Sequence, residues 1–291
     1  MPAQANQETV LITGGTDGLG RATAVLLAEQ GYRVIVTGRN PARRDALTAL
    51  ARERSLPIEA IEMDVCDDAA VDRGVSEVER RAQQIDVLIN NAGIGFVAVV
   101  EELRLDDFRR QFETNFFGVL RVTQRVLPGM RARRRGRIIN MSSLAGKLAI
   151  PLFGAYSGSK FALEGMTDAL RLELHPFGIH VVLIEPGYIP TGFQGAAGER
   201  SATYRQNTAS PYRRIYENYT AARKKMTEGV RDTPEDCARV VLRALRYNPP
   251  RARYTVTRPA RLFSLMKRFL SDRAFDRIII RRFRLERVDG A

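Results

Sequence analysis

Short runs of Val, Ile and Leu alternate along this chain with longer stretches that have helical periodicity. The runs lie at residues 10–12, 33–36, 57–61, 85–89, 136–140, 179–184 and 252–256. Near-continuous apolar runs of this length are typical of strands that are buried on both faces. Strands that are joined by helical crossovers run parallel to one another. The alternation therefore predicts an α/β fold: a doubly wound parallel sheet of about seven strands with helices on both faces.

Composition excludes several other classes of protein. Hydrophobic residues make up 44% of the chain and charged residues 27%, which excludes a disordered or fibrous chain. No apolar run reaches the ~18 residues that a membrane-spanning helix needs, and residues 1–8 lack a secretory pattern. Two cysteines, Cys66 and Cys237, cannot build a disulfide framework, and no Cys/His cluster suggests a metal site. We therefore expect a cytoplasmic protein without a bound metal.

The chain divides into one domain and a tail. We expect a single domain over residues 1–256, because no repeat or low-complexity linker interrupts the alternation. Within it, residues 190–232 are rich in Gly, Ala and Tyr and predict a loop-plus-helix insertion. The net charge of +13 comes mainly from the C-terminal end, where residues 243–291 hold 14 basic and 4 acidic side chains. Residues 257–291 are therefore predicted to form a basic, amphipathic tail.

A glycine-rich loop follows the first predicted strand and opens the first predicted helix. Its glycines are Gly14, Gly18 and Gly20, and the residues between them include Thr16, Asp17 and Leu19. Such a loop lets the backbone and the helix N-terminus approach a pyrophosphate. A plain strand-to-helix turn is the alternative, but the place of the loop in the first strand–helix unit of a Rossmann-like sheet favours dinucleotide binding.

The end of the second strand distinguishes between cofactors. An acidic residue there favours the 2′-hydroxyl of NAD(H), whereas a guanidinium favours the 2′-phosphate of NADP(H). This strand ends in Thr37-Gly38-Arg39-Asn40, with no acid and with Arg39 just past its end. The sequence therefore predicts NADP(H) rather than NAD(H), although a solvated arginine is the alternative and Asp17 places a negative charge near the phosphates.

Four polar residues suggest acid–base chemistry. Tyr156 and Lys160 are four residues apart, which places both on one face of a helix, about 5–6 Å apart at Cβ. An ammonium beside a phenol, together with a cationic nicotinamide ring, lowers the phenol pKa. Ser142 and Ser143 follow the fifth predicted strand, at the edge of a parallel sheet where ligands bind, and either can donate to a carbonyl oxygen.

These motifs together resemble the short-chain dehydrogenase/reductase superfamily, in its main single-domain branch. The likeness covers roughly residues 8–192 and follows the family's order and spacing. The matching residues are Thr13-Gly14, Gly18, Gly20, Asn90-Asn91-Ala92-Gly93, Asn115, Ser143, Tyr156, Lys160, Pro186-Gly187 and Thr191.

The resemblance implies a role for each motif residue. Tyr156 is the acid/base that exchanges a proton with the substrate oxygen, Ser143 orients that oxygen, and Ser142 ranks second to it. Lys160 binds the nicotinamide ribose and lowers the Tyr156 pKa, while Asn115 holds a water that links Lys160 to solvent.

The remaining motif residues are assigned to the cofactor. Asp64, next to Val65, accepts from the adenine amine. Asn91 and Gly93, on either side of Ala92, line the adenine ribose. Ile189 and Thr191, after Pro186, hold the nicotinamide carboxamide.

The stretch from Gly118 to Pro186, together with Arg251-Ala252-Arg253-Tyr254 and the apolar, basic tail, is similar to members that act on lipophilic alcohols and ketones of the retinoid or steroid type. Residues 190–232 are then expected to cover the substrate, and the family implies a homo-oligomer. The function so predicted is hydride transfer between NADP(H) and a lipophilic carbonyl or alcohol. A non-catalytic NADP(H)-sensing protein, whose basic tail binds a membrane or a partner, is the alternative.

The tail admits three interpretations. Apolar residues recur at helical spacing from Leu262 to Phe269 and again from Phe275 to Phe283, among many arginines. These faces either dock on the body of the protein or lie on an anionic lipid surface as a peripheral membrane contact. Nucleic-acid binding is the third interpretation, but no DNA- or RNA-reading module is present, so we expect no nucleic-acid partner.

Overall fold

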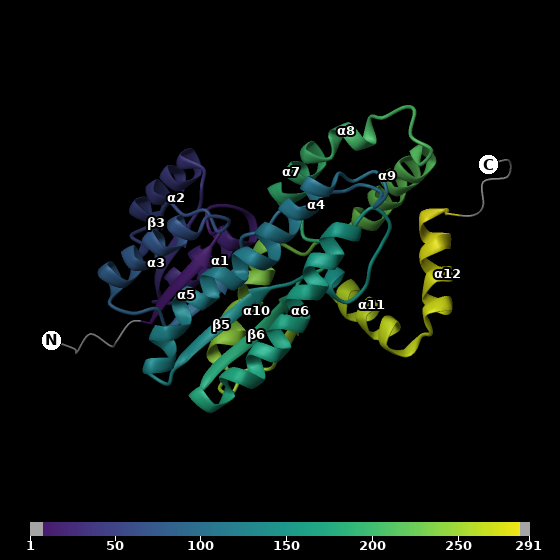
Figure 1. Ribbon diagram of the computed structural model, residues 1–291. Coiled ribbons are helices and arrows are strands. Elements are labelled where there is room, and N and C mark those ends of the chain that lie inside the picture. Colours follow the sequence, from purple (N-terminus) through teal and green to yellow (C-terminus); the bar gives the residue numbers. More distant parts are fainter. Residues whose placement is uncertain (1–7, 286–291) are drawn as a thin grey trace.

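The computed structural model describes residues 8–285, so residues 1–7 of the predicted domain and 286–291 of the predicted tail lie outside the described residues. Seven parallel strands form one sheet with the order β3-β2-β1-β4-β5-β6-β7 (Figure 1). The strands are β1 (Thr9–Thr13), β2 (Arg33–Thr37), β3 (Ile58–Ile61), β4 (Val87–Asn90), β5 (Gly136–Met141), β6 (Ile179–Glu185) and β7 (Arg253–Thr255). This sheet confirms the predicted fold class.

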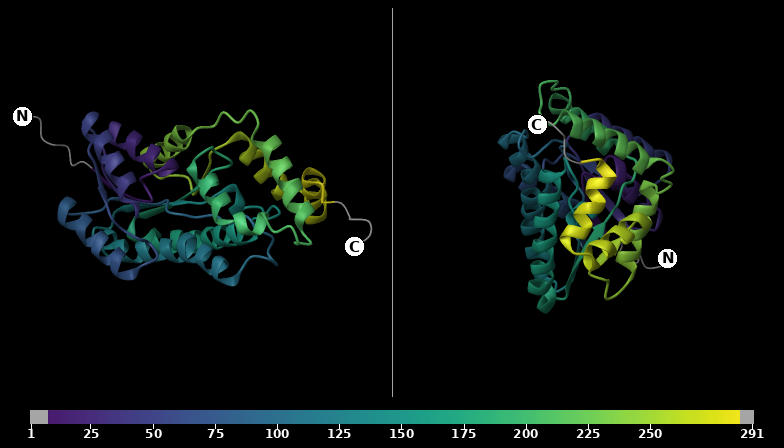
Figure 2. Two further views of the ribbon diagram at one scale, coloured as in Figure 1. Left: turned by 90° about the horizontal axis from the view of Figure 1, so that it is seen from above. Right: turned by 90° about the vertical axis from the view of Figure 1, so that its right-hand side faces the viewer.

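Successive side chains along each strand point to opposite faces of the sheet and pack into two separate hydrophobic cores. In β1, Val10 and Ile12 pack on one face of the sheet, and Leu11 packs on the other. The first face is covered by α1 (Gly18–Glu29), α2 (Pro41–Glu53) and α10 (Pro234–Arg246). The second is covered by α3 (Asp68–Ala82), α5 (Gly118–Ala132) and α6 (Gly154–Leu174), and Figure 2 shows the two layers on either side of the sheet. Burial on both faces explains why each strand reads as an unbroken apolar run.

The strand order reverses between β1 and β4. From β1 the chain proceeds outward to β2 and β3, and from β4 it proceeds in the opposite direction to β7. The loops that leave β1 and β4 therefore diverge at the carboxyl end of the sheet, which is where such sheets bind ligands.

Further helices lie beyond this carboxyl edge. They are α4 (Leu105–Phe112), which leads into α5 through the π-helical turn Glu113–Phe117, and α7 (Gly192–Arg200), α8 (Ala202–Arg205) and α9 (Arg213–Thr227). The segment predicted as a loop-plus-helix insertion thus contains three helices. No helix among residues 8–285 has the length and apolar character required to span a membrane.

The two helices of the tail differ in how they pack. In α12 (Asp272–Phe283), Phe275 and Phe283 are buried, and the Phe283 ring stacks on Tyr219 of α9 with centroids 6.0 Å apart. In α11 (Arg258–Phe269), by contrast, only Ala260 is fully buried. Of the three interpretations of the tail, docking on the body of the protein therefore applies to α12, whereas one face of α11 stays exposed.

Gly14 is a position where a side chain has no room. Its φ is +63°, and a Cβ would lie 2.8 Å from Ala92 Cα in the loop after β4. We expect Gly14→Ala to lower the free energy of unfolding by about 1–3 kcal/mol, because it adds left-handed strain and a backbone clash. Urea unfolding measures the change. In Gly165→Ala, the control on an open face of α6, an added Cβ meets nothing within 4 Å, so this variant should gain about 0.5–1 kcal/mol. Equal stability of the two variants would contradict the close contact.

Candidate active site

The predicted serine and tyrosine lie together at the carboxyl end of β5. Ser143 caps the 3₁₀ turn Leu144–Gly146, where its Oγ accepts a hydrogen bond from the Ala145 N–H at 3.1 Å. The same hydroxyl is within hydrogen-bonding reach of the Tyr156 hydroxyl, in the first turn of α6. The two residues that the resemblance pairs are therefore neighbours in the fold.

Ser142 has a different neighbour. Its buried Oγ lies beside Glu164 and under the 3₁₀ turn, where a Cβ on Gly146 would approach it to 2.8 Å. Of the two serines, Ser143 is thus the one that meets Tyr156.

Lys160 is buried one helical turn after Tyr156. Its Nζ lies 5.9 Å from the centroid of the Tyr156 ring and donates a hydrogen bond to the Met141 carbonyl oxygen at 2.7 Å. Burial lowers the pKa of Lys160 to about 8, and the Glu164 carboxylate opposes that effect by favouring the charged amine. At neutral pH the amine is therefore mainly an ammonium beside the Tyr156 ring.

The tyrosine itself is not a base in the protein alone. Burial raises the pKa of Tyr156, and the hydrogen bond from Ser143 only partly opposes this. The Lys160 ammonium donates to a backbone carbonyl rather than to the phenol oxygen. The lowered phenol pKa expected from the sequence thus stays a prediction for the cofactor-bound protein.

Aromatic side chains surround the Tyr156 ring. Phe153 meets it edge-on at 5.9 Å between centroids, and Phe193 of α7 lies at 5.8 Å. Phe153 also contacts Tyr219, whose ring stacks on the Phe283 ring of α12. An apolar aromatic layer therefore connects the tail to the catalytic candidates.

Asn115 is fully buried in the π-helical turn between α4 and α5. Its Oδ1 accepts from the Ile94 N–H at 2.8 Å, and its Nδ2 donates to the Ile94 carbonyl at 3.0 Å and to Ser159 Oγ at 3.2 Å. The side chain thus ties the loop after β4 to α6. The water-holding role implied by the resemblance stays a prediction.

The loops after β1 and β4 are held against each other by Asn91. Its Nδ2 donates to the carbonyls of Thr13 at 3.1 Å and Gly14 at 2.9 Å. A Cβ on Gly20 would lie 2.5 Å from that same Nδ2. Asn91 therefore shapes the glycine loop directly, while the contact with the adenine ribose that the resemblance implies stays a prediction.

Asp17 has a structural function in the same loop. It caps α1 by accepting from the Gly18 N–H at 2.8 Å, and its other oxygen pairs with Arg43 of α2 at 2.9 Å. Arg43, which the sequence reasoning did not single out, thus offsets the negative charge near the predicted phosphate site.

Arg39 and Asp64 face each other across the ends of β2 and β3. Arg39 Nη1 lies 3.2 Å from Asp64 Oδ2, and Asp64 Oδ1 accepts from the Cys66 N–H at 3.0 Å. Burial would raise the pKa of Asp64, but the Cys66 hydrogen bond and the guanidinium outweigh it and lower that pKa. A pocket of about 360 Å³ opens beside Arg39.

Further arginines that the sequence reasoning missed surround this pocket. Arg109 and Arg110 of α4 line it together with Arg39. Arg200 of α7 is half-buried, and its pKa is lowered by burial and by the charges of Arg110 and Arg39. Positive charge therefore converges on the pocket from three elements.

The other predicted cofactor residues lie along the same crevice. Thr191 caps α7 and lies against Gly18, where a Cβ would meet the threonine Cβ at 3.4 Å. Gly93 lies against Asn115 Oδ1, and the Pro186 carbonyl accepts from the Leu144 N–H at 2.8 Å. Thr16 follows β1, Leu19 packs at the edge of the core, Ala92 packs on Gly14, and Val65 and Ile189 are buried.

Comparison with known proteins identifies the family of this chain. Residues 8–202 match the family model described as short chain dehydrogenase. A 3-ketodihydrosphingosine reductase of Bacteroides thetaiotaomicron is 42% identical over 186 residues, which cover 64% of this chain and 65% of the reductase. Retinol dehydrogenase 8 of Bos taurus is 34% identical over 264 residues, which cover 88% of this chain and 84% of that enzyme.

A solved structure shares the same arrangement. A variant of actinorhodin polyketide ketoreductase with NADPH is 30% identical, with a TM-score of 0.74 over 86% of this chain and 96% of the ketoreductase. The family match covers more than half of the chain and includes the glycine loop, the serine and the Tyr156–Lys160 pair. The chain therefore belongs to the short-chain dehydrogenase family of oxidoreductases.

Proposed function

We propose that this protein transfers a hydride between NADP(H) and the carbonyl or alcohol carbon of a lipophilic substrate. The observation that carries the proposal is the meeting of Ser143 and Tyr156 beside the buried amine of Lys160. A sensing protein has no need of an acid/base, so this trio argues against the non-catalytic alternative. The cytoplasmic location and the homo-oligomer stay predictions.

The residues at the crevice fit a dinucleotide. Gly14 and Gly20 let the loops after β1 and β4 pack closely against each other. The glycine loop so formed opens α1, and a pyrophosphate would bind at the N-terminus of that helix. Arg39, Arg109 and Arg110 line a pocket at the end of β2, where a 2′-phosphate would meet guanidinium groups. The similar ketoreductase with NADPH supports the same cofactor.

The side chains present can move the proton of such a reaction. A bound nicotinamide supplies the hydride in reduction and accepts it in oxidation. Tyr156 gives its proton to the substrate oxygen in reduction, and its raised pKa in the protein alone suits a proton donor. Ser143 donates a hydrogen bond to that oxygen, and the Lys160 ammonium stabilises the phenolate left on Tyr156.

The surroundings of Tyr156 support a lipophilic substrate. Phe153 and Phe193 flank its ring, and Tyr219 extends the aromatic layer away from it. Apolar walls with few polar groups are typical of sites for apolar ligands. The names of the two relatives specify retinol and 3-ketodihydrosphingosine, which are both lipophilic molecules.

Tyr156→Phe tests the catalytic assignment. It removes the proton donor but keeps the ring, so turnover on ketones and alcohols should fall about 10²- to 10⁴-fold. NADPH binding, followed by NADPH fluorescence, should stay within about twofold because the variant keeps the aromatic ring and leaves the glycine loop unchanged. As a matched pair, Ser143→Ala should lose activity and Ser142→Ala should not. Full activity of Tyr156→Phe would refute the proposal.

Arg39→Ala tests the cofactor preference. Loss of a charge-assisted hydrogen bond of about 1.5–3 kcal/mol should reduce the NADPH-to-NADH ratio of kcat/KM by about 10- to 100-fold. Arg52→Ala, which removes an exposed arginine from the last turn of α2, is the control and should leave the ratio unchanged. A parent protein that uses NADH as well as NADPH would contradict the NADP(H) assignment.

We also propose that α11 contacts an anionic lipid surface. Leu262, Leu265 and Phe269 are 58%, 54% and 73% exposed, and their spacing places them on one face of the helix. Exposed Arg261 and Arg268 flank that face. An apolar stripe beside basic residues is typical of helices that lie in a membrane interface, and it suits an enzyme whose substrate resides in lipid.

Liposome sedimentation tests this contact. The protein should sediment with phosphatidylglycerol-containing vesicles and less with pure phosphatidylcholine, because the arginines attract anionic headgroups. The triple change Leu262→Ser, Leu265→Ser and Phe269→Ser should reduce binding about tenfold or more, because it removes the three apolar side chains that would be buried in the lipid on binding. Leu172→Ser, at an isolated leucine on α6 that is 75% exposed, should bind like the parent. Equal binding of the triple variant would exclude α11 as the contact.

A further inference from the structure

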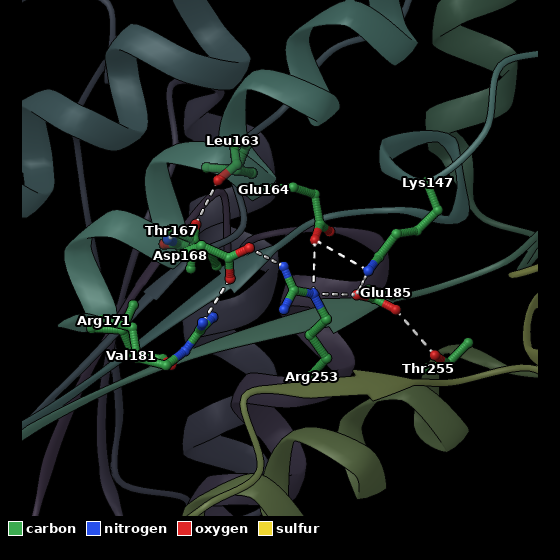
Figure 3. Close-up of polar contacts among 11 residues, drawn as sticks. Lys147, Leu163, Glu164, Thr167, Asp168, Arg171, Val181, Glu185, Arg253 and Thr255 are labelled. Atoms are coloured by element: carbon green, nitrogen blue, oxygen red, sulfur yellow. Dashed lines mark hydrogen bonds and ion pairs between the residues drawn. The ribbon is translucent and has the colours of Figure 1, made fainter. Parts of the chain in front are cut away.

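A cluster of charged side chains lies behind the catalytic candidates, on the side of α6 that faces β6 and β7. Figure 3 shows how they converge from the turn after β5, from α6 and from the two strands. The members are Lys147, Glu164, Asp168, Arg171, Glu185 and Arg253. The proposed function uses none of these side chains, and no sequence motif assigns a role to Lys147.

Glu164 is the member of this cluster that is linked to the active site. It follows Lys160 by one helical turn, so both side chains lie on one face of α6, and each is 6% exposed. Among the described residues, its carboxylate is the one whose charge acts on the Lys160 amine. It does so without displacing the hydrogen bond from Lys160 Nζ to the Met141 carbonyl.

Two cations hold the Glu164 carboxylate in place. Its Oε2 lies 3.2 Å from Arg253 Nε and 3.7 Å from Lys147 Nζ (Figure 3). The same two cations contact Oε1 of the buried Glu185, at 3.3 Å and 3.2 Å. A Cβ on Gly146 would lie 3.0 Å from Glu164 Cγ, so the 3₁₀ turn also packs closely on this side chain.

Two buried polar atoms near Lys147 and Arg253 belong to Ser142 and to Glu164 itself. Ser142 Oγ lies beside its carboxylate, and within the described chain neither that hydroxyl nor Glu164 Oε1 has a hydrogen-bond partner. Asp168, one turn further along α6, pairs with Arg253 and Arg171. Burial raises the pKa of Glu164, and the charges of Lys147 and Arg253 oppose that rise. With Glu164 ionised, the three carboxylates and three cations of the cluster balance, and Lys160 is the additional positive charge.

We propose that Glu164 is a positioning residue that keeps Lys160 charged, with Lys147 and Arg253 fixing its carboxylate one helical turn behind the amine. This arrangement leaves the ammonium free of a direct carboxylate contact, so it can still act on Tyr156. The benefit to catalysis rests on the proposed function, whereas the electrostatic effect is a property of the protein alone.

In alcohol oxidation, Tyr156 must accept a proton as the phenolate, and the loss of the Glu164 charge then has an effect that pH does not reverse. A Tyr156 phenolate with a Lys160 ammonium, and a neutral phenol with a neutral amine, contain the same number of protons. Removing the Glu164 charge favours the neutral pair. A change of pH cannot restore the ionic pair, because both forms respond to pH alike.

The small number of lysines allows a direct measurement. The chain has Lys147, Lys160, Lys224, Lys225 and Lys267, so ¹³C-lysine labelling gives five side-chain signals that NMR can titrate, and Lys160→Arg assigns the key one. In the parent protein without cofactor, Lys160 should titrate with a pKa of about 8. In Glu164→Gln the pKa should be about one pH unit lower, as expected for loss of a nearby opposite charge.

Matched variants separate this effect from a loss of packing. Asp168→Asn removes a carboxylate from the same cluster and should leave the Lys160 titration unchanged. Glu164→Asp keeps the charge and should remain close to the parent. If Glu164→Gln does not fold, the double variant Glu164→Gln with Lys147→Met keeps the cluster neutral, and it should still show the lower Lys160 pKa.

Activity provides the second readout. In alcohol oxidation, Glu164→Gln should lower kcat about tenfold at every pH of the profile, and Asp168→Asn should not. An unchanged Lys160 titration in a folded charge-removing variant overturns the proposal. A shifted titration with unchanged kcat would support the electrostatic link and instead contradict the role of Lys160 in the proposed function.

Discussion

The buried ammonium of Lys160 is the group on which the active-site half of this protein depends. A buried cation is costly unless nearby groups compensate for the water that it loses. Here the Met141 carbonyl accepts its hydrogen bond and Glu164 supplies the opposite charge. Because β5, β6 and β7 are adjacent in the sheet, Arg253 on the edge strand reaches the same cluster. A strand far from the glycine loop in sequence thus contributes to the electrostatics of the site.

The half of the sheet that carries the glycine loop forms its candidate ligand site from backbone, at positions without side chains. Gly14 and Gly20 approach the loop after β4 so closely that Asn91 can bond to the backbone of both loops at once. At the rim of this half, the Arg39 side chain is 56% exposed and pairs with Asp64. The contrast has a physical reason: exposed guanidinium groups can exchange one anionic partner for another at little cost, whereas a buried ammonium needs permanent partners.

The sequence predicted the local features of this architecture and missed most of the non-local ones. Strands and the glycine loop are visible because their signals lie within a few consecutive residues. The Glu164 cluster is not, because Lys147 and Arg253 are 106 positions apart and only the sheet order brings them together. The π-helical turn that holds Asn115 has no signature of its own. The pKa of Tyr156 also escaped prediction, since burial, which raises it, depends on packing by Phe153 and Phe193.

The tail illustrates the same limit. Its two helices have the same kind of amphipathic pattern, yet Phe283 of α12 is buried on Tyr219 whereas Phe269 of α11 is 73% exposed. Periodicity determines which face of a helix is apolar, but only the surrounding fold determines what covers it. The covered helix continues an aromatic layer that reaches Tyr156 through Tyr219 and Phe153. The tail packs toward Tyr156 with α12 and exposes apolar side chains on α11, the helix before it. Because both helices belong to one short segment, the tail can couple the proposed site to a lipid surface.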